Sequence, residues 1–311
     1  MKDKHVVITG GAGFIGSNIA RKLYAENKVT ILDDLSTGHI ENIQSMLDEE
    51  KIDFVKGSIT DLSLVQDVFS DTDIVFHEAA IPSVPRSVDD PIRSNNANIN
   101  GTLNVLVAAR DNNVQKVVYA SSSSVYGDSP SLPKHEEMTP NPLSPYAVNK
   151  LAAEYYCQVF TGVYGLKTVA LRYFNVFGPY QDPAGAYAAV IPKFIDLISQ
   201  GKSPIIYGDG SQSRDFTFID NVVQANIKAA ENPDISGVFN AACGTKITVN
   251  DLAKELMNII GREVDIIYEP PRTGDILHSL ADSSKAKNSF GYEPTVSIND
   301  GLKETVEWFQ K

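Results

Sequence analysis

Tyr146 and Lys150 are the residues whose types and spacing most clearly suggest chemistry, in the segment Ser144-Pro-Tyr-Ala-Val-Asn-Lys150. On a helix, residues four apart share a face, so the lysine ammonium can favour the ionised phenol of the tyrosine. A free tyrosine titrates near pH 10, and bringing its pKa to about 7 needs roughly 4 kcal/mol of differential stabilisation. We expect the ammonium and the positive ring of an oxidised nicotinamide to supply it together. Tyr146 is then a general base.

The spacing of Tyr146 and Lys150 is common in proteins, but a glycine-rich turn upstream makes a catalytic role for the pair more credible. The segment Thr9-Gly-Gly-Ala-Gly-Phe-Ile-Gly16 follows a short apolar run and precedes a helical pattern. In that context the glycines let the backbone approach a pyrophosphate, which the free N–H groups of the helix start can bind. Asp33 ends the next predicted strand and fits an acid that hydrogen-bonds the adenine ribose. Its carboxylate and that of Asp34 would repel a 2′-phosphate, which favours NAD over NADP.

Composition narrows the possible partners and compartment. The chain has 311 residues and a net charge of −12, which argues against nucleic acid or an acidic membrane as a partner. It contains no apolar run of about 18 residues, so we expect no membrane span. Cys157 and Cys243 are the only cysteines. Their separation predicts neither a disulfide nor a metal site, and we expect a cytoplasmic protein.

The order of the predicted elements indicates the fold. Strands alternate with helices in the first half, which predicts an α/β fold with a doubly wound parallel sheet of the Rossmann type. The predicted strands are His5–Gly10, Val29–Asp33, Ile52–Lys56, Asp73–His77, Lys116–Ala120 and Lys167–Arg172. The predicted helices are Phe14–Asn27, Leu62–Phe69, Pro91–Asn112, Pro145–Tyr164 after an N-cap at Ser144, Ala189–Gln200, Asn221–Glu231, Val249–Ile260 and Ile298–Phe309. We expect residues 1–173, with about 215–240, to bind the dinucleotide, and residues 174–214 and 241–311 to form a smaller α/β lobe for a substrate.

Seven segments along nearly the whole chain carry a family resemblance. They are Thr9–Gly16, Ser121-Ser-Ser-Ser-Val-Tyr-Gly127, Tyr146–Lys150, Leu171-Arg-Tyr-Phe-Asn175, Gly208-Asp-Gly210, Arg214-Asp-Phe-Thr-Phe-Ile-Asp220 and Arg272-Thr-Gly-Asp275. With them the chain resembles the extended short-chain dehydrogenases/reductases, and among these the nucleotide-sugar 4-epimerases. Within that group, Gly185-Ala-Tyr-Ala-Ala-Val-Ile-Pro192 resembles the branch that acts on UDP-N-acetylglucosamine.

The resemblance implies a role for each matching residue. Tyr146 is the base, Lys150 its electrostatic partner and ribose ligand, and Ser122, assisted by Ser123, binds the sugar 4-oxygen. The cofactor, tightly bound NAD, is expected at Gly10, Gly13, Phe14, Ile15, Gly16, Asp33, Asp34, Ser36, Thr37, Gly38, Ser58, Ile59, Ala79, Ala80, Asn98, Ala120, Tyr146, Lys150 and Tyr173. Ser58 departs from the acid that many relatives carry there. The UDP-sugar is expected at Pro82, Ser122, Tyr146, Asn175, Ala189, Val190, Lys193, Tyr207, Arg214, Arg272, Asp275 and Ser279.

Two of these substrate contacts are arginines. Arg214 and Arg272 are expected to grip the diphosphate, which paired guanidinium groups suit. Asn175 joins them there, and Asp275 is expected on the uridine ribose. The two long helices, near Pro91–Asn112 and Tyr146–Tyr164, resemble the pair through which the family dimerises, which implies a homodimer with a four-helix contact.

The reaction is inferred from the segment around the catalytic serine. Related 4,6-dehydratases and uronate decarboxylases carry acids directly after it, whereas Ser122-Ser-Ser-Val-Tyr-Gly127 has none. We therefore expect transient oxidation of C4 of a UDP-hexose, turnover of the 4-keto sugar in the pocket, and re-reduction from the opposite face. The alternatives are a UDP-glucuronate 4-epimerase or decarboxylase, and an NAD-binding sensor or scaffold without catalysis. Relatives restricted to unsubstituted hexoses carry a bulky tyrosine where this chain has Ser279, so N-acetylated UDP-hexoses should be accepted.

Overall fold

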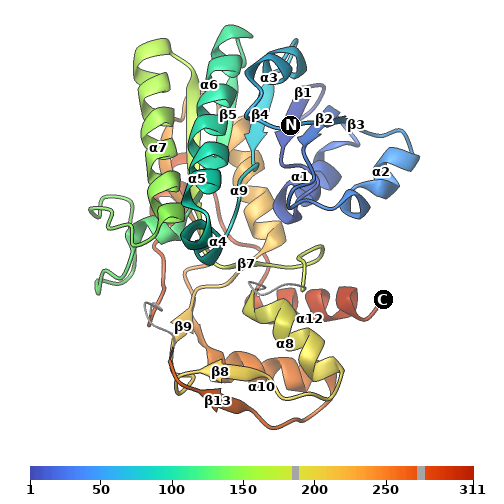
Figure 1. The fold of residues 1–311 in the computed structure, drawn as a ribbon, viewed down its shortest axis with the longest axis vertical. Helices are drawn as coiled ribbons and strands as arrows, with labels where there is room; N and C mark the ends of the chain where they lie inside the picture. Colours follow the sequence, from blue (N-terminus) through green and yellow to red (C-terminus); the bar gives the residue numbers. More distant parts are fainter. Residues whose placement is uncertain (184–188, 272–276) are drawn as a thin grey trace.

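A seven-stranded parallel sheet forms the centre of the molecule (Figure 1), in a computed structural model that describes residues 1–183, 189–271 and 277–311. The strand order is β11-β6-β5-β4-β1-β2-β3, and each strand is parallel to its neighbours. The strands are β1 His5–Thr9, β2 Lys28–Asp33, β3 Asp53–Lys56, β4 Ile74–His77, β5 Lys116–Ser122, β6 Lys167–Tyr173 and β11 Gly237–Ala241. The predicted doubly wound α/β fold is confirmed.

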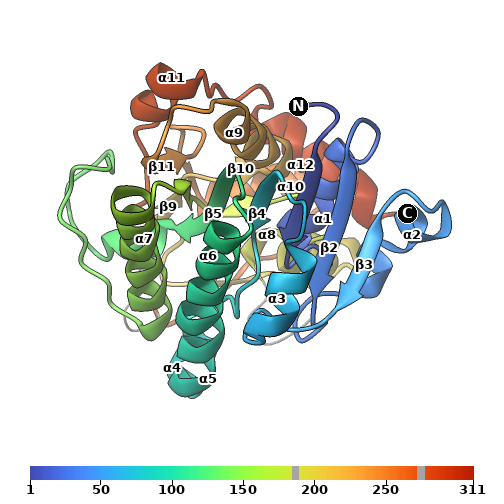
Figure 2. The same cartoon turned by 90° about the horizontal axis from the view of Figure 1, so that it is seen from above.

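Helices cover both faces of the sheet, because its strands carry apolar residues on both sides. Val6 and Ile8 of β1 join one buried cluster and Val7 joins the other. Figure 2 shows α3, α6 and α7 on one side of the sheet and α9 on the other. The helices that flank the sheet are α1 Phe14–Leu23, α3 Leu62–Val68, α6 Gly101–Asp111, α7 Pro145–Tyr164 and α9 Ile219–Glu231.

The predicted helix over Pro91–Asn112 is interrupted. It consists of α5 (Pro91–Asn95), a π-helical turn at Asn96–Asn100, and then α6. The predicted helix that begins at Phe14 ends at Leu23. The helical pieces that the sequence pattern did not predict are α2 Gln44–Asp48, α4 Val84–Asp89, α11 Ser284–Phe290 and the 3₁₀ turns Ile40–Asn42 and Ser123–Tyr126.

A smaller lobe lies beyond the carboxyl ends of the strands (Figure 1). Its helices are α8 Val190–Ser199, α10 Val249–Ile260 and α12 Ile298–Phe309. Three two-stranded pairs accompany them: β7 Val176–Phe177 with β10 Thr217–Phe218, β8 Ile205–Tyr207 with β13 Ile267–Glu269, and β9 Ser213–Arg214 with β12 Ile247–Thr248. Apolar residues of α1, α8, α9, α10 and α12 belong to one buried cluster, so the lobe and the sheet share a core.

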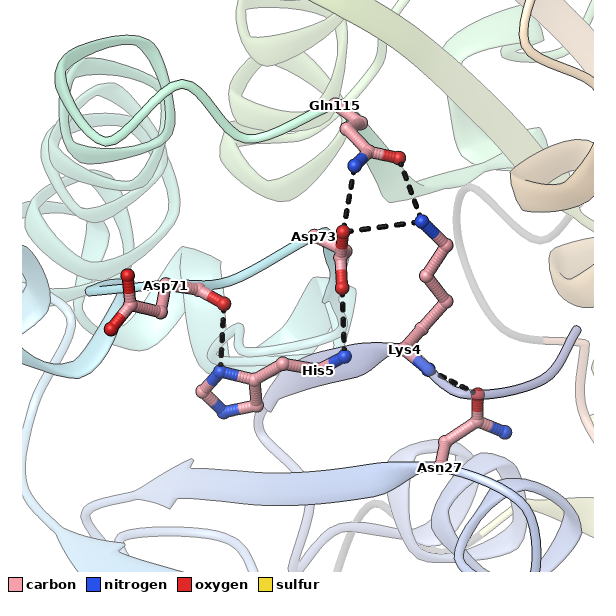
Figure 3. Close-up of polar contacts among 6 residues, drawn as sticks. All are labelled: Lys4, His5, Asn27, Asp71, Asp73 and Gln115. Atoms are coloured by element: carbon pink, nitrogen blue, oxygen red, sulfur yellow. Dashed lines mark hydrogen bonds and ion pairs between the residues drawn. The ribbon is translucent and has the colours of Figure 1, made fainter.

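The amino ends of the strands are held together by polar side chains (Figure 3). Asp73 accepts hydrogen bonds from the His5 backbone N–H at 2.9 Å, from Lys4 Nζ at 3.2 Å and from Gln115 Nε2 at 2.6 Å. Burial raises the pKa of Asp73, but the His5 N–H and Lys4 outweigh it, so that this pKa is lowered on balance. This network occupies the edge of the sheet opposite the glycine turn and leaves the carboxyl edge free for a site.

Candidate active site

The carboxyl ends of the central strands line a cavity of about 520 Å³. Nearly every residue expected at the dinucleotide lies on its wall. These residues are Gly10, Gly13, Phe14, Ile15, Gly16, Asp33, Asp34, Ser36, Thr37, Gly38, Ser58, Ile59, Ala79, Ala80, Ala120, Tyr146, Lys150 and Tyr173. The motif positions along the sequence therefore converge on one space.

The glycine turn leaves no room for side chains. Gly10 has a φ of +71°, and a Cβ built on it would lie 2.6 Å from the Ala79 backbone nitrogen. A Cβ on Gly16 would lie 2.5 Å from the Gly10 carbonyl oxygen. Gly13 is the N-cap of α1 and supplies no capping side chain. A bare backbone cradle at a helix start suits the pyrophosphate of a dinucleotide, so these residues fit NAD.

Asp33 holds the turn as well as lining the cavity. Its carboxylate accepts hydrogen bonds from the backbone N–H of Ala12 at 3.0 Å and of Leu35 at 2.8 Å. Burial raises the pKa of Asp33, and these two donors oppose that rise. The position at the end of β2 is the one expected for a ribose ligand.

Asn98 lies beneath this cavity and does not line it. It is 1% exposed, its Oδ1 accepts from Ile81 N at 2.8 Å, and its Nδ2 donates to Ile81 O at 3.1 Å. Asn98 therefore holds the loop after β4, and its direct contact with the cofactor stays a prediction. That loop, through Ala79, Ala80 and Pro82, does line the cavity.

A second cavity of about 470 Å³ adjoins the first. Five expected substrate or catalytic residues besides Tyr146 lie on its wall: Ser122, Ser123, Asn175, Arg214 and Ser279. The residues common to both cavities are Ile15, Ser83, Ser121, Tyr146 and Tyr173. Tyr146 thus stands on the wall between the two spaces, where a group can face both a cofactor and a substrate.

The remaining expected substrate residues lie elsewhere. Pro82 and Ala189 line the first cavity. Val190, Lys193 and Tyr207 line neither of the two cavities. Arg272 and Asp275 lie outside the described residues, as do residues 185–188 of the segment Gly185–Pro192.

Tyr146 and its neighbours are fixed by short hydrogen bonds. Ser144 caps α7 by accepting from Ala147 N at 3.2 Å, as predicted. The Ser122 hydroxyl faces the Tyr146 phenol and acts to lower its pKa. Lys150 Nζ lies 5.8 Å from the centroid of the Tyr146 ring and donates to the Ala120 carbonyl oxygen at 2.6 Å. Base, hydroxyl and ammonium are therefore held together by α7 and the end of β5.

The side chains alone do not lower the pKa of Tyr146. Burial raises it to about 12; the Ser122 hydrogen bond lowers it and the negative charge of Glu78 raises it further. Burial also lowers the pKa of Lys150 to about 8, against the opposing effect of Glu78 and Glu154. Lys150 and a cationic nicotinamide together are expected to lower the pKa of Tyr146, and the protein's own charges do not lower it.

A buried ion pair between Arg172 and Glu154 contacts the segment that carries Ser122. Arg172 Nε and Nη2 donate to the two carboxylate oxygens of Glu154 at 2.9 and 2.7 Å. Ser121 Oγ donates to the same carboxylate. The Arg172 guanidinium also lies 4.6 Å from the ring centroid of Tyr126. This network links α7, β5 and β6 next to Ser122 and fixes their relative position.

Several lining residues were missed by sequence reasoning. They are His39, Asn42, Glu78, Ser83, Arg86, Arg93, Tyr180, Gln181 and Asp182 in the first cavity, and Ser124, Tyr126, Lys134, Phe174 and His278 in the second. Glu78 directly follows a predicted strand, and that position was an available signal. Ser124, Tyr126 and Phe174 lie inside the motif segments Ser121–Gly127 and Leu171–Asn175, which was a signal for them too, whereas the rest depend on how distant segments meet.

Neither metal ligands nor a membrane helix are found within the residues that the structure describes. No group of three or more His, Cys, Asp or Glu side chains there could hold a metal ion. No helix there is long and apolar enough to cross a membrane. Cys157 and Cys243 are both free thiols.

Comparison with known proteins agrees with this geometry. A family model described as the NAD dependent epimerase/dehydratase family matches residues 6–242. The chain is 47% identical to a UDP-N-acetylglucosamine 4-epimerase from Methanobrevibacter ruminantium M1, solved in complex with UDP-N-acetylmuramic acid, with a TM-score of 0.95 and coverage of 100% and 99% of the two chains.

Two further relatives are similar over their whole length. A UDP-glucose 4-epimerase of Mycolicibacterium smegmatis is 38% identical over 98% of each chain. The structure of a UDP-glucose 4-epimerase of Thermus thermophilus in complex with NAD is 34% identical, with a TM-score of 0.90 and coverage of 98% and 99%. The similarity therefore extends through both the sheet and the smaller lobe.

Proposed function

Because this chain belongs to the NAD dependent epimerase/dehydratase family, we propose that it is a UDP-hexose 4-epimerase. It interconverts UDP-N-acetylglucosamine with UDP-N-acetylgalactosamine, and UDP-glucose with UDP-galactose. The observation that carries this proposal is the position of Tyr146 on the wall shared by the two cavities. The first cavity suits the dinucleotide, and the second suits the sugar.

The side chains of this protein act on the sugar 4-oxygen and on the diphosphate. When bound, NAD would supply reversible transfer of a hydride, one proton with two electrons, at the sugar C4. Tyr146 takes the proton of the 4-hydroxyl and later returns it, and Ser122 hydrogen-bonds the same oxygen. Arg214 and Asn175 hold the diphosphate, so that the sugar stays tethered while it presents its other face.

The segment that carries the catalytic serine has no acidic residue, and this favours epimerisation over the alternative reactions. The segment Ser122–Gly127 contains no carboxylate, whereas elimination of water needs an acid and a base at the neighbouring carbons. Tyr126 and Gly127 continue the cavity wall without adding one. This supports a reaction that only oxidises and re-reduces one carbinol.

Ser279 supports the acceptance of N-acetylated sugars. It lines the second cavity, and its backbone N–H donates to the Ser213 carbonyl oxygen at 3.0 Å, so its position is fixed by β9. A serine at this wall leaves space that a tyrosine would fill. We therefore infer that the 2-acetamido group is accommodated there.

We assign the residues that bind the cofactor and those that bind the sugar according to the two cavities. Residues 1–173 with about 215–240 bind the dinucleotide, and residues 174–214 and 241–311 bind the UDP-sugar. α9 and β11 support the first assignment, since both pack with the central sheet. The net charge of −12 and the two free cysteines are consistent with the proposed cytoplasmic location.

We also propose a homodimer through a four-helix contact. Among the exposed apolar residues of α7 are Val148 by 48%, Tyr155 by 52%, Val159 by 50% and Val163 by 68%, and Ile92 of α5 is exposed by 82%. Their spacing places them along one face of the helix. Val159→Glu should convert the dimer to a monomer in sedimentation velocity, and an unchanged dimer would contradict this contact.

The function is tested by incubating the purified protein with UDP-N-acetylglucosamine and, separately, with UDP-glucose. Proton NMR should show the C4 epimer of each, and mass spectrometry should show no change in mass. Loss of carbon dioxide from UDP-glucuronate would indicate a decarboxylase. Bound NAD without any conversion would indicate a sensor or scaffold.

A further inference from the structure

Glu78 is a carboxylate in the first cavity to which the reaction above assigns no role. It follows β4 directly and lines the cavity together with Tyr146, Lys150 and Tyr173. Its Oε1 accepts a hydrogen bond from the Tyr173 hydroxyl at 2.9 Å. Asn226 Nδ2 donates to that hydroxyl oxygen at 2.8 Å, and Asn226 Oδ1, at 3.0 Å, is a second acceptor for the hydroxyl proton besides Glu78. The carboxylate is therefore fixed in place.

The groups that face Glu78 leave its negative charge only partly balanced. Burial raises the pKa of Glu78 to about 7, while the Tyr173 hydroxyl and Lys150 act in the opposite direction. The other titratable groups that face it are the Tyr146 phenol on α7 and the Tyr119 phenol on β5, and both have a raised pKa. His77, the preceding residue, has a pKa lowered to about 3 by burial and stays neutral. A further positive charge in this part of the cavity would therefore be stabilised.

The two redox forms of NAD differ by such a charge. The nicotinamide ring is cationic in the oxidised form and neutral in NADH. Tyr146 must reach the hydroxyl oxygen on the carbon that exchanges hydrogen with this ring. The ring therefore belongs at the end of the cavity that Tyr146, Lys150 and Glu78 line. At the other end, Asp34 lies beyond β2 on the adenine side.

We propose that Glu78 makes the cavity bind oxidised NAD in preference to NADH, by placing a fixed carboxylate at the nicotinamide end. It is a positioning residue that acts on the cofactor's charge and takes no proton from the sugar. A resting protein that retains the oxidised form is ready to accept hydrogen from the sugar. A protein that held NADH without a keto sugar could not start turnover, because the reduced cofactor cannot accept hydrogen from the sugar.

This inference depends on the proposed position of the cofactor, but its test needs no sugar and no turnover. The holoprotein is equilibrated with an excess of an equimolar mixture of NAD and NADH at about pH 8.5, where Glu78 is ionised. Free dinucleotide is removed, the protein is denatured, and the released NAD and NADH are quantified by chromatography. A failure of this test would leave any measured epimerase activity standing, and an inactive protein can still show the preference.

Glu78→Gln keeps the shape and the acceptor for Tyr173 but removes the charge. The ratio of bound NADH to bound NAD should rise about tenfold, equivalent to ~30 mV for a two-electron couple. Asp34→Asn is the matched control, because it neutralises a carboxylate of the same cavity at the adenine end and should leave the ratio unchanged. Equal ratios in the wild type and Glu78→Gln, or an equal rise in both variants, would overturn the proposal.

The wild type provides a second measurement that needs no variant. Lowering the pH from about 8.5 to about 5.5 protonates Glu78 and also Lys150, whose pKa is lowered to about 8, so the ratio should move towards NADH in the wild type and by a clearly smaller factor in Glu78→Gln, where Lys150 titrates without Glu78. A wild-type ratio that is constant over this range would overturn the proposal.

Discussion

The ammonium of Lys150 donates a hydrogen bond to the carbonyl oxygen of Ala120 at 2.6 Å. Ala120 lies in β5, two residues before Ser122, and Lys150 lies on α7, one turn after Tyr146. The contact therefore joins the segment that carries the base to the segment that carries the hydroxyl. It also places the positive charge beneath the phenol, with Nζ 5.8 Å from the ring centroid.

Tyr146→Phe removes the proposed base and leaves the cavity shape intact. Turnover of UDP-N-acetylglucosamine should fall by roughly 10²–10⁴-fold, while bound NAD, measured after denaturation, should stay near the wild-type amount. Tyr155→Phe is the matched control, because it makes the same substitution at an exposed position of α7. Near-normal turnover of Tyr146→Phe by proton NMR would remove Tyr146 from the mechanism.

Ser279→Tyr should close the space proposed for the 2-acetamido group. Activity on UDP-N-acetylglucosamine should fall at least about 100-fold, with activity on UDP-glucose largely retained, because only the former needs that space. Ser279→Ala keeps the space and should leave both activities within a few-fold of the wild type. An equal loss on both substrates for Ser279→Tyr would argue against a gate at this position.

Gly16→Ala tests the bare backbone of the turn. Its Cβ would lie 2.5 Å from the Gly10 carbonyl oxygen and 2.7 Å from Gly11 Cα, so the turn must shift and NAD should be lost or bound at least about tenfold more weakly. Gly162→Ala is the control, because a Cβ there meets nothing within 4 Å on α7. That control should stabilise the protein by roughly 0.5–1 kcal/mol. An NAD content of Gly16→Ala equal to that of the wild type would contradict the proposal that the bare backbone of this turn binds the pyrophosphate.

Glu154→Gln breaks the buried pair with Arg172 and leaves the guanidinium without a counter-charge. The two side chains are 1% and 4% exposed, so the free energy of unfolding should fall by about 3–5 kcal/mol in urea titrations. The double variant Glu154→Gln/Arg172→Met should lose less than Glu154→Gln alone, since it removes the unpaired charge. Additive losses would show that the pair is not coupled.

Much of the sheet and of the cofactor site could be predicted from the sequence, because both depend on local patterns. Short apolar runs predicted six strands, and the glycine turn with Asp33 predicted the dinucleotide cavity. The π-helical turn at Asn96–Asn100 could not be predicted, since it changes the backbone hydrogen bonds without changing the apolar spacing. β11 was not predicted as a strand either: Gly237-Val-Phe-Asn-Ala241 is short, and its partner β6 lies far away in the sequence.

The substrate side depended more on tertiary contacts. Arg214 and Ser279 were found by their motifs, and the pairing of Ser213 with the segment around Ser279 brings them to one cavity. Glu78 lies in none of the seven motif segments, and Tyr126 lies in the motif Ser121–Gly127 but had no assigned role. Their importance comes from what the fold places beside them, Tyr173 for the first and Arg172 for the second.

The last strand of the central sheet, β11, pairs with β6 although more than sixty residues of chain intervene. During synthesis, one edge of β6 therefore stays unpaired until the residues of β11 have left the ribosome. An open strand edge invites pairing with another chain. A fragment that stops shortly after β6 should accordingly aggregate on expression, so any minimal cofactor-binding fragment has to extend past Ala241.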